Sequence, residues 1–141
     1  MSRIFWDAML FVYLLEGHRK YAPQVNSLLE ASYERGDVLL TSYLAIGEVL
    51  VGVPVGSPLA QTIFETVEQM GFSFIEFDRQ CVEPFRLLRT TFGLKAPDAM
   101  HLACAAAAKT DLFLTGDGQL LKKHLHVPGI HFIANFENPP L

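Results

Sequence analysis

The chain has 141 residues, half of them hydrophobic, and a formal net charge of −4 at pH 7. This length and apolar content predict one folded domain over residues 1–141 with a substantial core, and they exclude a disordered chain. The acidic balance argues against a protein that holds nucleic acid by charge alone, although an enzyme that touches a few phosphates needs only a local site.

Short apolar runs alternate with segments of helical periodicity from the first residues on. Residues 3–7 (RIFWD) and 38–42 (VLLTS) are predicted strands because they are short and apolar. The helices predicted around these strands cover residues 8–16, 22–35 and 43–51.

The second half continues this alternation after a loop rich in glycine and proline, GVPVGSP at residues 52–58. The predicted helices are residues 59–70, 79–92 and 97–109. The predicted strands are residues 72–78, 112–115 and 131–135, the last at an edge. Apolar strands separated by helices predict an α/β fold, in which a parallel sheet is covered by helices on both faces.

Three aspartates fall at junctions between predicted strands and helices. Asp7 ends the first strand, Asp117 follows the strand 112–115, and Asp98 opens the helix that leads into that strand. Ligands of open parallel sheets bind outside the carboxyl ends of the strands, so all three aspartates are expected at one edge. Each aspartate alone is equally well explained as a helix cap or as a charge that complements a helix dipole.

Glu48 is harder to explain in structural terms. It is the only charged residue between Asp37 and Glu65, and it lies in the apolar segment YLAIGEVLVG. A carboxylate in such surroundings is costly unless it has a partner or lines a polar cavity. No lysine or arginine is near in sequence. One helical turn places Glu48 close to the carboxyl end of the second strand, and therefore at the edge expected for the aspartates.

Four carboxylates at one edge would repel one another and raise each other's pKa values, and a divalent cation would relieve this conflict. Mg²⁺ and Mn²⁺ prefer oxygen ligands and share their sites with substrate phosphates. Such a site supports metal-assisted hydrolysis of phosphodiesters, with the Thr115 hydroxyl placed to orient a ligand or a water. The candidate metal ligands and catalytic residues are Asp7, Glu48, Asp98 and Asp117.

Three stretches of the chain carry a resemblance to a known family: FWDAMLFVYLLEG, LLTSYLAIGEVLVG and LKAPDAMHLACAAAAKTDLFLTGD. In this order they resemble the PIN-domain nucleases, specifically the VapC-like toxins. The resemblance implies a three-layer PIN fold with strand order 3-2-1-4-5 and an endoribonuclease that depends on Mg²⁺ or Mn²⁺. It also implies a homodimer inhibited by an antitoxin protein. The acidic set of that family falls on Asp7, Glu48, Asp98 and Asp117, supported by Thr115.

The chain departs from that family at three positions. Ala8 and Met9 stand where the family often has a hydroxyl residue and an Asn, and Gly116 stands where an Asn commonly precedes the last Asp. Side chains that would support the acids are therefore missing, which keeps open a second interpretation: a catalytically weak module that binds protein or RNA. A third, a phosphotransfer or phosphatase domain with Asp7 as nucleophile, is disfavoured because position 9 is not Asp.

Other features have ordinary explanations. Cys81 and Cys104 are expected to be buried thiols in a reducing cytosol. No apolar run reaches the roughly 20 residues of a membrane span, and acidic residues interrupt the apolar N-terminal stretch, which argues against a signal peptide. We therefore expect a cytoplasmic protein without a membrane partner.

The histidines and arginines are also interpreted conservatively. His101 is expected to be a core or rim histidine, and His124 and His126 lack the second pair of ligands that a zinc site needs. Solvated charges on helix faces are preferred over a phosphate-facing patch as the explanation of three basic residues, Arg86, Arg89 and Lys95.

Overall fold

The computed structural model describes residues 1–140. Its strands are β1 (Arg3–Trp6), β2 (Val38–Ser42), β3 (Phe72–Ile75), β4 (Thr110–Thr115) and β5 (Ile130–Asn135). Its helices are α1 (Ala8–Leu15), α2 (Ala22–Arg35), α3 (Tyr43–Leu50), α4 (Leu59–Gln69), the 3₁₀ turn η1 (Arg79–Cys81), α5 (Val82–Thr90), α6 (Ala96–Ala107) and α7 (Gly118–Lys122). All strands pair in parallel in the order β3-β2-β1-β4-β5, which confirms the predicted fold class and strand order.

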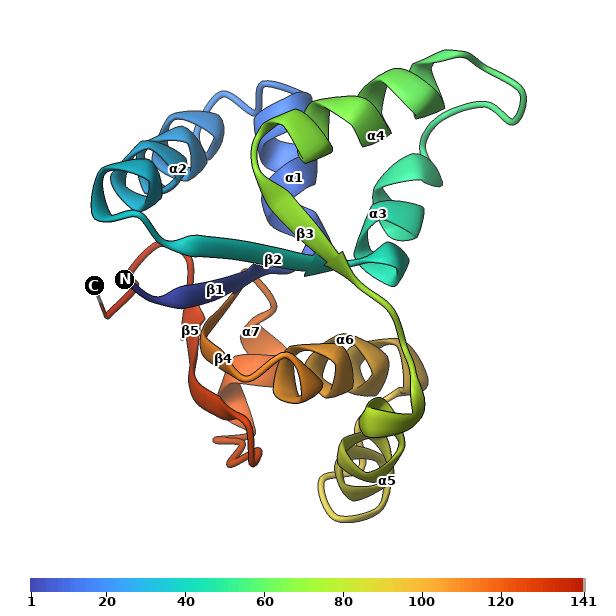
Figure 1. Cartoon of the computed structure of the whole chain (residues 1–141), viewed down its shortest axis with the longest axis vertical. Coiled ribbons are helices and arrows are strands. Elements are labelled where there is room, and N and C mark those ends of the chain that lie inside the picture. The colour runs from blue at the N-terminus through green and yellow to red at the C-terminus, as the bar shows by residue number, and fades with distance from the viewer. Residues whose placement is uncertain (141) are drawn as a thin grey trace.

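Helices cover both faces of the sheet, with α1 to α4 on one face and α5 to α7 on the other (Figure 1). Successive side chains of a strand point to opposite faces. Phe5 and Phe113 accordingly join the core beside α5 and α6, while their neighbours Ile4 and Leu112 join the core beside α1 and α2. Because both faces are buried, the middle of each central strand is a continuous apolar run.

The alanine-rich helix α6 lies close to its neighbours. Ala99, Ala103 and Ala105 are fully buried, as expected for small residues that let a helix approach a sheet. The turn before β5 approaches α6 just as closely: a Cβ on Gly129, whose φ is +98°, would collide with the backbone carbonyl of Ala106. Only glycine fits this backbone conformation at this distance.

The predicted boundaries differ most at one strand. The strand predicted over 72–78 stops at Ile75, and the helix predicted over 79–92 is a 3₁₀ turn followed by α5, which ends at Thr90. The carboxylate of Asp78 accepts a hydrogen bond from the N–H of Gln80 at 3.0 Å and so caps the start of this turn. Within residues 1–140, no helix combines the length and the apolar character that crossing a bilayer requires.

The carboxyl edge of the sheet gathers several helix ends. The chain passes directly from β1 into α1, from β2 into α3 and, after Gly116 and Asp117, from β4 into α7. Helix α6 leads back along the sheet into β4, so its first turn lies at the same edge. Side chains from four helices can therefore meet there, although they are far apart in sequence.

Candidate active site

Asp7 is the first residue after β1 and caps α1. Its Oδ1 accepts a hydrogen bond from the N–H of Ala8 at 2.7 Å, and its Oδ2 accepts one from the hydroxyl of Thr115 at 2.7 Å. The Thr115 hydroxyl oxygen in turn accepts a hydrogen bond from the N–H of Asp117 at 3.0 Å. The buried hydroxyl of Thr115 thus fixes Asp7 relative to the start of the segment that follows β4.

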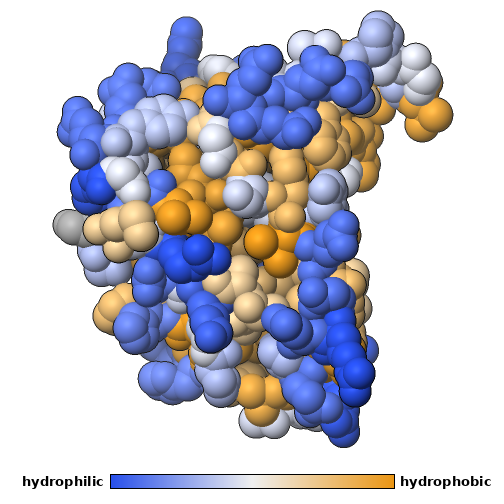
Figure 2. Space-filling model, in the orientation of Figure 1, coloured by the Kyte–Doolittle hydropathy of each residue, from blue (hydrophilic) through white to orange (hydrophobic). Residues whose placement is uncertain are grey.

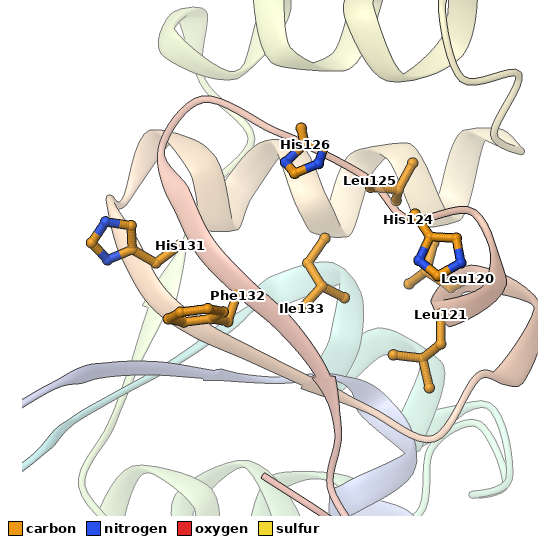
Figure 3. A pocket seen from close by; sticks show the side chains of 8 residues that line it. All are labelled: Leu120, Leu121, His124, Leu125, His126, His131, Phe132 and Ile133. Atoms are coloured by element: carbon orange, nitrogen blue, oxygen red, sulfur yellow. The ribbon is translucent and has the colours of Figure 1, made fainter. Parts of the chain in front are cut away.

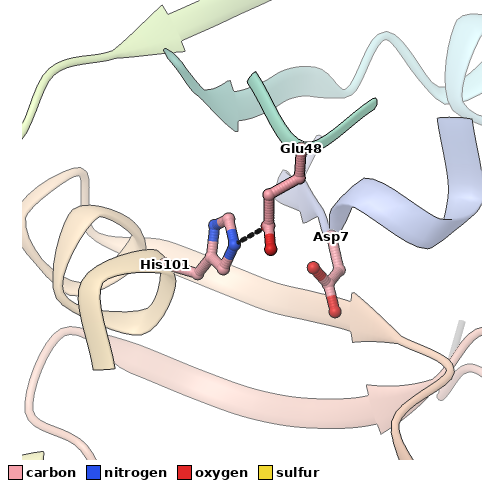
Figure 4. Close-up of side chains that lie close together, drawn as sticks. All are labelled: Asp7, Glu48 and His101. Atoms are coloured by element: carbon pink, nitrogen blue, oxygen red, sulfur yellow. Dashed lines mark hydrogen bonds and ion pairs between the residues drawn. The ribbon is translucent and has the colours of Figure 1, made fainter. Parts of the chain in front are cut away.

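Glu48 projects from α3 toward this edge, where its Oε1 contacts Nε2 of His101 from α6 (Figure 4). The possible ligand atoms of Asp7, Glu48 and His101 all lie within 4.8 Å of one another. The side chain of Glu48 is 43% exposed, whereas that of His101 is only 5% exposed. The glutamate therefore reaches solvent while its partner is anchored in the protein, and that partner is a histidine rather than a lysine or an arginine.

Asp98 lies in the first turn of α6 and is electrostatically coupled to the other acids. Burial is the largest cause that raises the pKa of its carboxyl group above 3.8. The negative charges of Asp117 and Asp7 raise this pKa further, and that of Glu48 adds a smaller increase, while His101 acts in the opposite direction. The other three acids predicted from the sequence therefore all lie close enough to Asp98 to act on it at this edge of the sheet.

Asp117 has a structural role as well as a place in this group. Its Oδ1 accepts hydrogen bonds from the N–H groups of Gln119 at 3.0 Å and Leu120 at 3.3 Å, so it caps α7. Asp98 and Asp117 also line a common hollow of about 200 Å³. Capping and membership of an acidic group are therefore compatible in this fold.

The sequence did not predict the roles of two residues at this edge. His101 was expected in the core or at its rim, and it is indeed buried, but one of its ring nitrogens faces Glu48. Lys123 lines the hollow beside Asp98, together with Lys95. Its sequence position, in a lysine pair at the end of α7, gave no signal of this.

The three basic residues considered for a phosphate-facing patch do not gather beside the acids, in keeping with the preference for solvated charges. Arg86 donates a hydrogen bond to Glu83 at 2.7 Å, and Arg89 donates one to the carbonyl of Leu94 at 2.9 Å. Of the three basic residues considered for a phosphate-facing patch, only Lys95 lines the acidic hollow.

Three other histidines line a separate hollow of about 280 Å³ between α7 and β5 (Figure 3). His131 lies on β5, apart from His124 and His126 in the connection that precedes that strand. Within residues 1–140, the only group of three or more side chains close enough to share a metal ion is the one at the acidic edge.

Comparison with known proteins assigns the chain to a family. A family model described as the PIN domain matches residues 4–124. This chain belongs to the PIN-domain family. The resemblance to PIN-domain proteins seen in the sequence is thereby confirmed. No curated protein matches the sequence.

Solved structures agree with the family assignment. A chain of VapBC2 from Rickettsia felis, bound to a DNA fragment from its promoter, has a TM-score of 0.72 and 16% identity, with 94% of this chain and 97% of that one covered. A chain of a toxin–antitoxin complex from Klebsiella pneumoniae has a TM-score of 0.61 and 23% identity, with coverages of 92% and 95%. A chain of DNA-bound VapBC from Salmonella typhimurium has a TM-score of 0.64 and 15% identity, with 96% of this chain and 99% of that one covered. At these identities, the likeness shows a shared fold.

The raised pKa of Asp98 makes a prediction for the metal-free PIN domain. An ionised Asp98 is unfavourable in the folded state, so the protein loses stability as the pH rises through the folded-state pKa of this group. Asp98→Asn removes the repelling charge and should raise the melting temperature at pH 7 in the presence of chelator. We expect a gain of roughly 2–4 °C, because solvent screens part of the repulsion. The gain should shrink as the pH is lowered toward 3.8, where the wild-type carboxyl group also becomes neutral.

The matched control is Asp78→Asn. Asp78 caps η1 and is not among the charges that raise the pKa of Asp98, and Asn caps about as well as Asp. Its melting temperature should therefore stay at the wild-type value. Equal shifts for the two variants would mean that Asp98 acts only as an ordinary helix-terminal residue.

Proposed function

We propose that this PIN domain is an endoribonuclease that hydrolyses RNA phosphodiester bonds with Mg²⁺ or Mn²⁺. The observation that supports this best is the gathering of four carboxylates at the carboxyl edge, where burial raises the pKa of Asp98 most and the charges of Asp117 and Asp7 raise it further. Crowded oxygen ligands with uncompensated negative charge suit a hard divalent cation. The proposed metal ligands are Asp7, Glu48, Asp98 and Asp117.

The chain's own residues prepare this set of ligands. A divalent ion, when bound, supplies Lewis-acid activation of the phosphodiester and of the attacking water. The Thr115 hydroxyl donates a hydrogen bond to Asp7 and accepts one from the N–H of Asp117. One buried hydroxyl therefore orients two of the acids. The N–H of Ala8 holds the other oxygen of Asp7. Ligands held in place before binding lose less freedom when the ion and the substrate arrive.

Two lysines support a polyanionic substrate. Lys95 and Lys123 line the hollow that Asp98 and Asp117 also line. The ammonium group of Lys123 donates a hydrogen bond to the carbonyl of Phe92 at 3.4 Å, which holds it near this hollow. An acidic protein that acts on RNA needs such local cations. We propose that the two lysines bind phosphates next to the scissile one.

We further propose that the protein is the toxin of a type II toxin–antitoxin pair and works as a homodimer inhibited by its antitoxin. Structures of the same fold from three bacteria are toxin–antitoxin or VapBC complexes. A protein partner also fits the surface of this chain. Figure 2 shows apolar atoms at the tip of the connection between α3 and α4, where Val51, Val55 and Leu59 are exposed. Neighbouring exposed apolar side chains of this kind are typical of interfaces.

A catalytically weak binding module remains the alternative, and one observation favours it. A Cβ at Gly116 would lie 3.1 Å from Cε1 of Phe136, so the Asn common in the family at this position would press against this ring. Ala8 and Met9 likewise lack polar side chains. The acids therefore have fewer supporting groups than the family usually provides, and weaker supporting groups lower metal affinity.

Ribonuclease activity is the direct test of the main proposal. The purified protein, freed of any inhibitor, should cleave RNA with Mn²⁺ or Mg²⁺, and chelator should abolish the cleavage. Asp98→Asn should lower the rate by about 100-fold or more, because metal-supplied stabilisation of a transition state is worth several kcal/mol. Asp78→Asn should cleave like the wild type. Intact RNA across a broad panel of substrates with both metals would favour the binding module.

The lysine pair predicts a separate kinetic effect. Lys123→Gln should raise the KM for RNA several-fold at saturating Mn²⁺ while kcat stays close to the wild-type value, because the lost contact is made equally in the ground state and the transition state. The slope of log KM against log salt concentration should fall by about 0.7 for one lost phosphate contact. Lys122→Gln is the matched control, since the exposed Lys122 is adjacent but does not line the hollow. Equal effects of the two changes would show a general loss of charge instead of a local contact.

The proposed toxin role predicts an effect in cells. Expression of this chain alone should slow bacterial growth, and co-expression of a neighbouring gene that encodes its antitoxin should restore it. The Asp98→Asn variant, expressed to the same soluble level, should not slow growth, because it lacks a proposed metal ligand. Unchanged growth at high levels of soluble wild-type protein would count against toxicity without bearing on RNA cleavage in vitro.

A further inference from the structure

His101 is a buried histidine with contacts at both ring nitrogens. Its side chain is 5% exposed and lies on α6, three residues after Asp98. Nδ1 lies 3.2 Å from the hydroxyl oxygen of Ser42, and Nε2 contacts Oε1 of Glu48 (Figure 4). The histidine therefore connects the end of β2 to the carboxylate that α3 presents at the acidic edge.

If the His101 ring is neutral, only one arrangement of hydrogen-bond donors and acceptors satisfies the contacts from Ser42 to Glu48. The Ser42 hydroxyl oxygen accepts a hydrogen bond from the N–H of Ala45 at 3.0 Å and so caps α3. Its own proton is then free to be donated to Nδ1 of His101. The ring proton lies on Nε2 and is donated to Glu48, whose ionised carboxylate can only accept. Ser42 thus sets the tautomer that lets His101 hold Glu48.

Glu48 needs such support more than the other three acids do. Asp7 and Asp117 cap helices, and Asp98 lies in a helical first turn, where the positive end of the helix dipole stabilises a carboxylate. Glu48 lies in the last turn of α3, where the dipole has the opposite sign. Its side chain is also long, half-exposed and costly to order.

A neutral donor suits this position better than a cation would. A lysine or an arginine paired with Glu48 would fix the carboxylate but also cancel the negative charge that a metal ion requires. The N–H of a neutral imidazole orients the oxygen and leaves the charge in place. Groups that donate a hydrogen bond to a metal ligand tune the affinity of the metal site.

We propose that His101 is a positioning residue that holds the carboxylate of Glu48 toward Asp7, with its own tautomer set by Ser42. This inference rests on the proposed function, because the carboxylate is positioned for a divalent cation. It adds a residue to the site that is neither a metal ligand nor a contact of the substrate.

The test measures Mn²⁺ dissociation constants by calorimetry for the wild type, His101→Leu and His101→Gln. Losing the donor in His101→Leu should weaken Mn²⁺ binding by roughly 10-fold to 100-fold. The amide nitrogen of Gln reaches about the place of Nε2, so His101→Gln should recover most of the affinity. Met100→Leu, a volume-conserving change in the same turn of α6, is the control for disturbed packing and should bind Mn²⁺ like the wild type. Wild-type affinity in His101→Leu would overturn the proposal.

A double-mutant cycle separates positioning from direct ligation. If His101 acts through Glu48, His101→Leu should have no further effect on Mn²⁺ binding in a Glu48→Gln background. A second loss of similar size in that background would mean that the imidazole itself binds the metal, and it would overturn the positioning role.

A measurement on the metal-free protein keeps this inference separable from the proposed function. Long-range proton–nitrogen NMR should show the His101 ring with its proton on Nε2, and the Nε2–H signal should shift in Glu48→Gln. A neutral ring with its proton on Nδ1 would overturn the inference whatever the metal data show. A wild-type protein that binds no Mn²⁺ would overturn the metal-dependent function, while the NMR result would still decide whether His101 holds Glu48.

Discussion

Mutual repulsion among carboxylates at the carboxyl edge of the sheet is the constraint around which this PIN domain is built. The free energy of this crowding must be offset elsewhere, and the offset comes from two buried faces of a parallel sheet. Three of the acids also lie where helices begin, so the N–H groups and dipoles of α1, α6 and α7 offset part of the repulsion locally. The pKa of Asp98 is still raised, first by burial and then by the charges of Asp117 and Asp7.

The topology is what makes this crowding possible. With β1 between β2 and β4, the residues that follow the three central strands meet at the same edge, and α6 returns its first turn to that edge. Thr115 then ties two of the acids together across the β1–β4 pair. The paired strands β1 and β4 therefore help to set the separation of Asp7 and Asp117, which favours a preorganised site.

Local pattern was enough to predict the architecture and to point to the acidic edge. Apolar runs separated by helical periodicity gave the α/β class, and the apolar surroundings of Glu48 correctly signalled that it needs a partner. The identity of that partner was out of reach, because His101 is 53 residues away and the two meet only through the packing of α3 and α6. The place of Lys123 beside the acidic hollow could not be predicted for the same reason, because it too depends on tertiary packing. The predicted strand 72–78 was too long, since the chain leaves the sheet after Ile75 and reaches the turn that Asp78 caps.

The Phe136 ring has a consequence for how this sequence can change. Phe136 is buried directly after β5, and its N–H is bonded to the carbonyl of Thr115 at 3.1 Å. A Cβ at position 116 would lie 3.1 Å from Cε1 of this ring, so the ring would have to give by a few tenths of an ångström to admit it. The two positions are therefore in steric contact, although 20 residues separate them. A side chain before the final aspartate is accommodated more easily once the aromatic residue is replaced by a smaller one, so packing favours one order of the two substitutions.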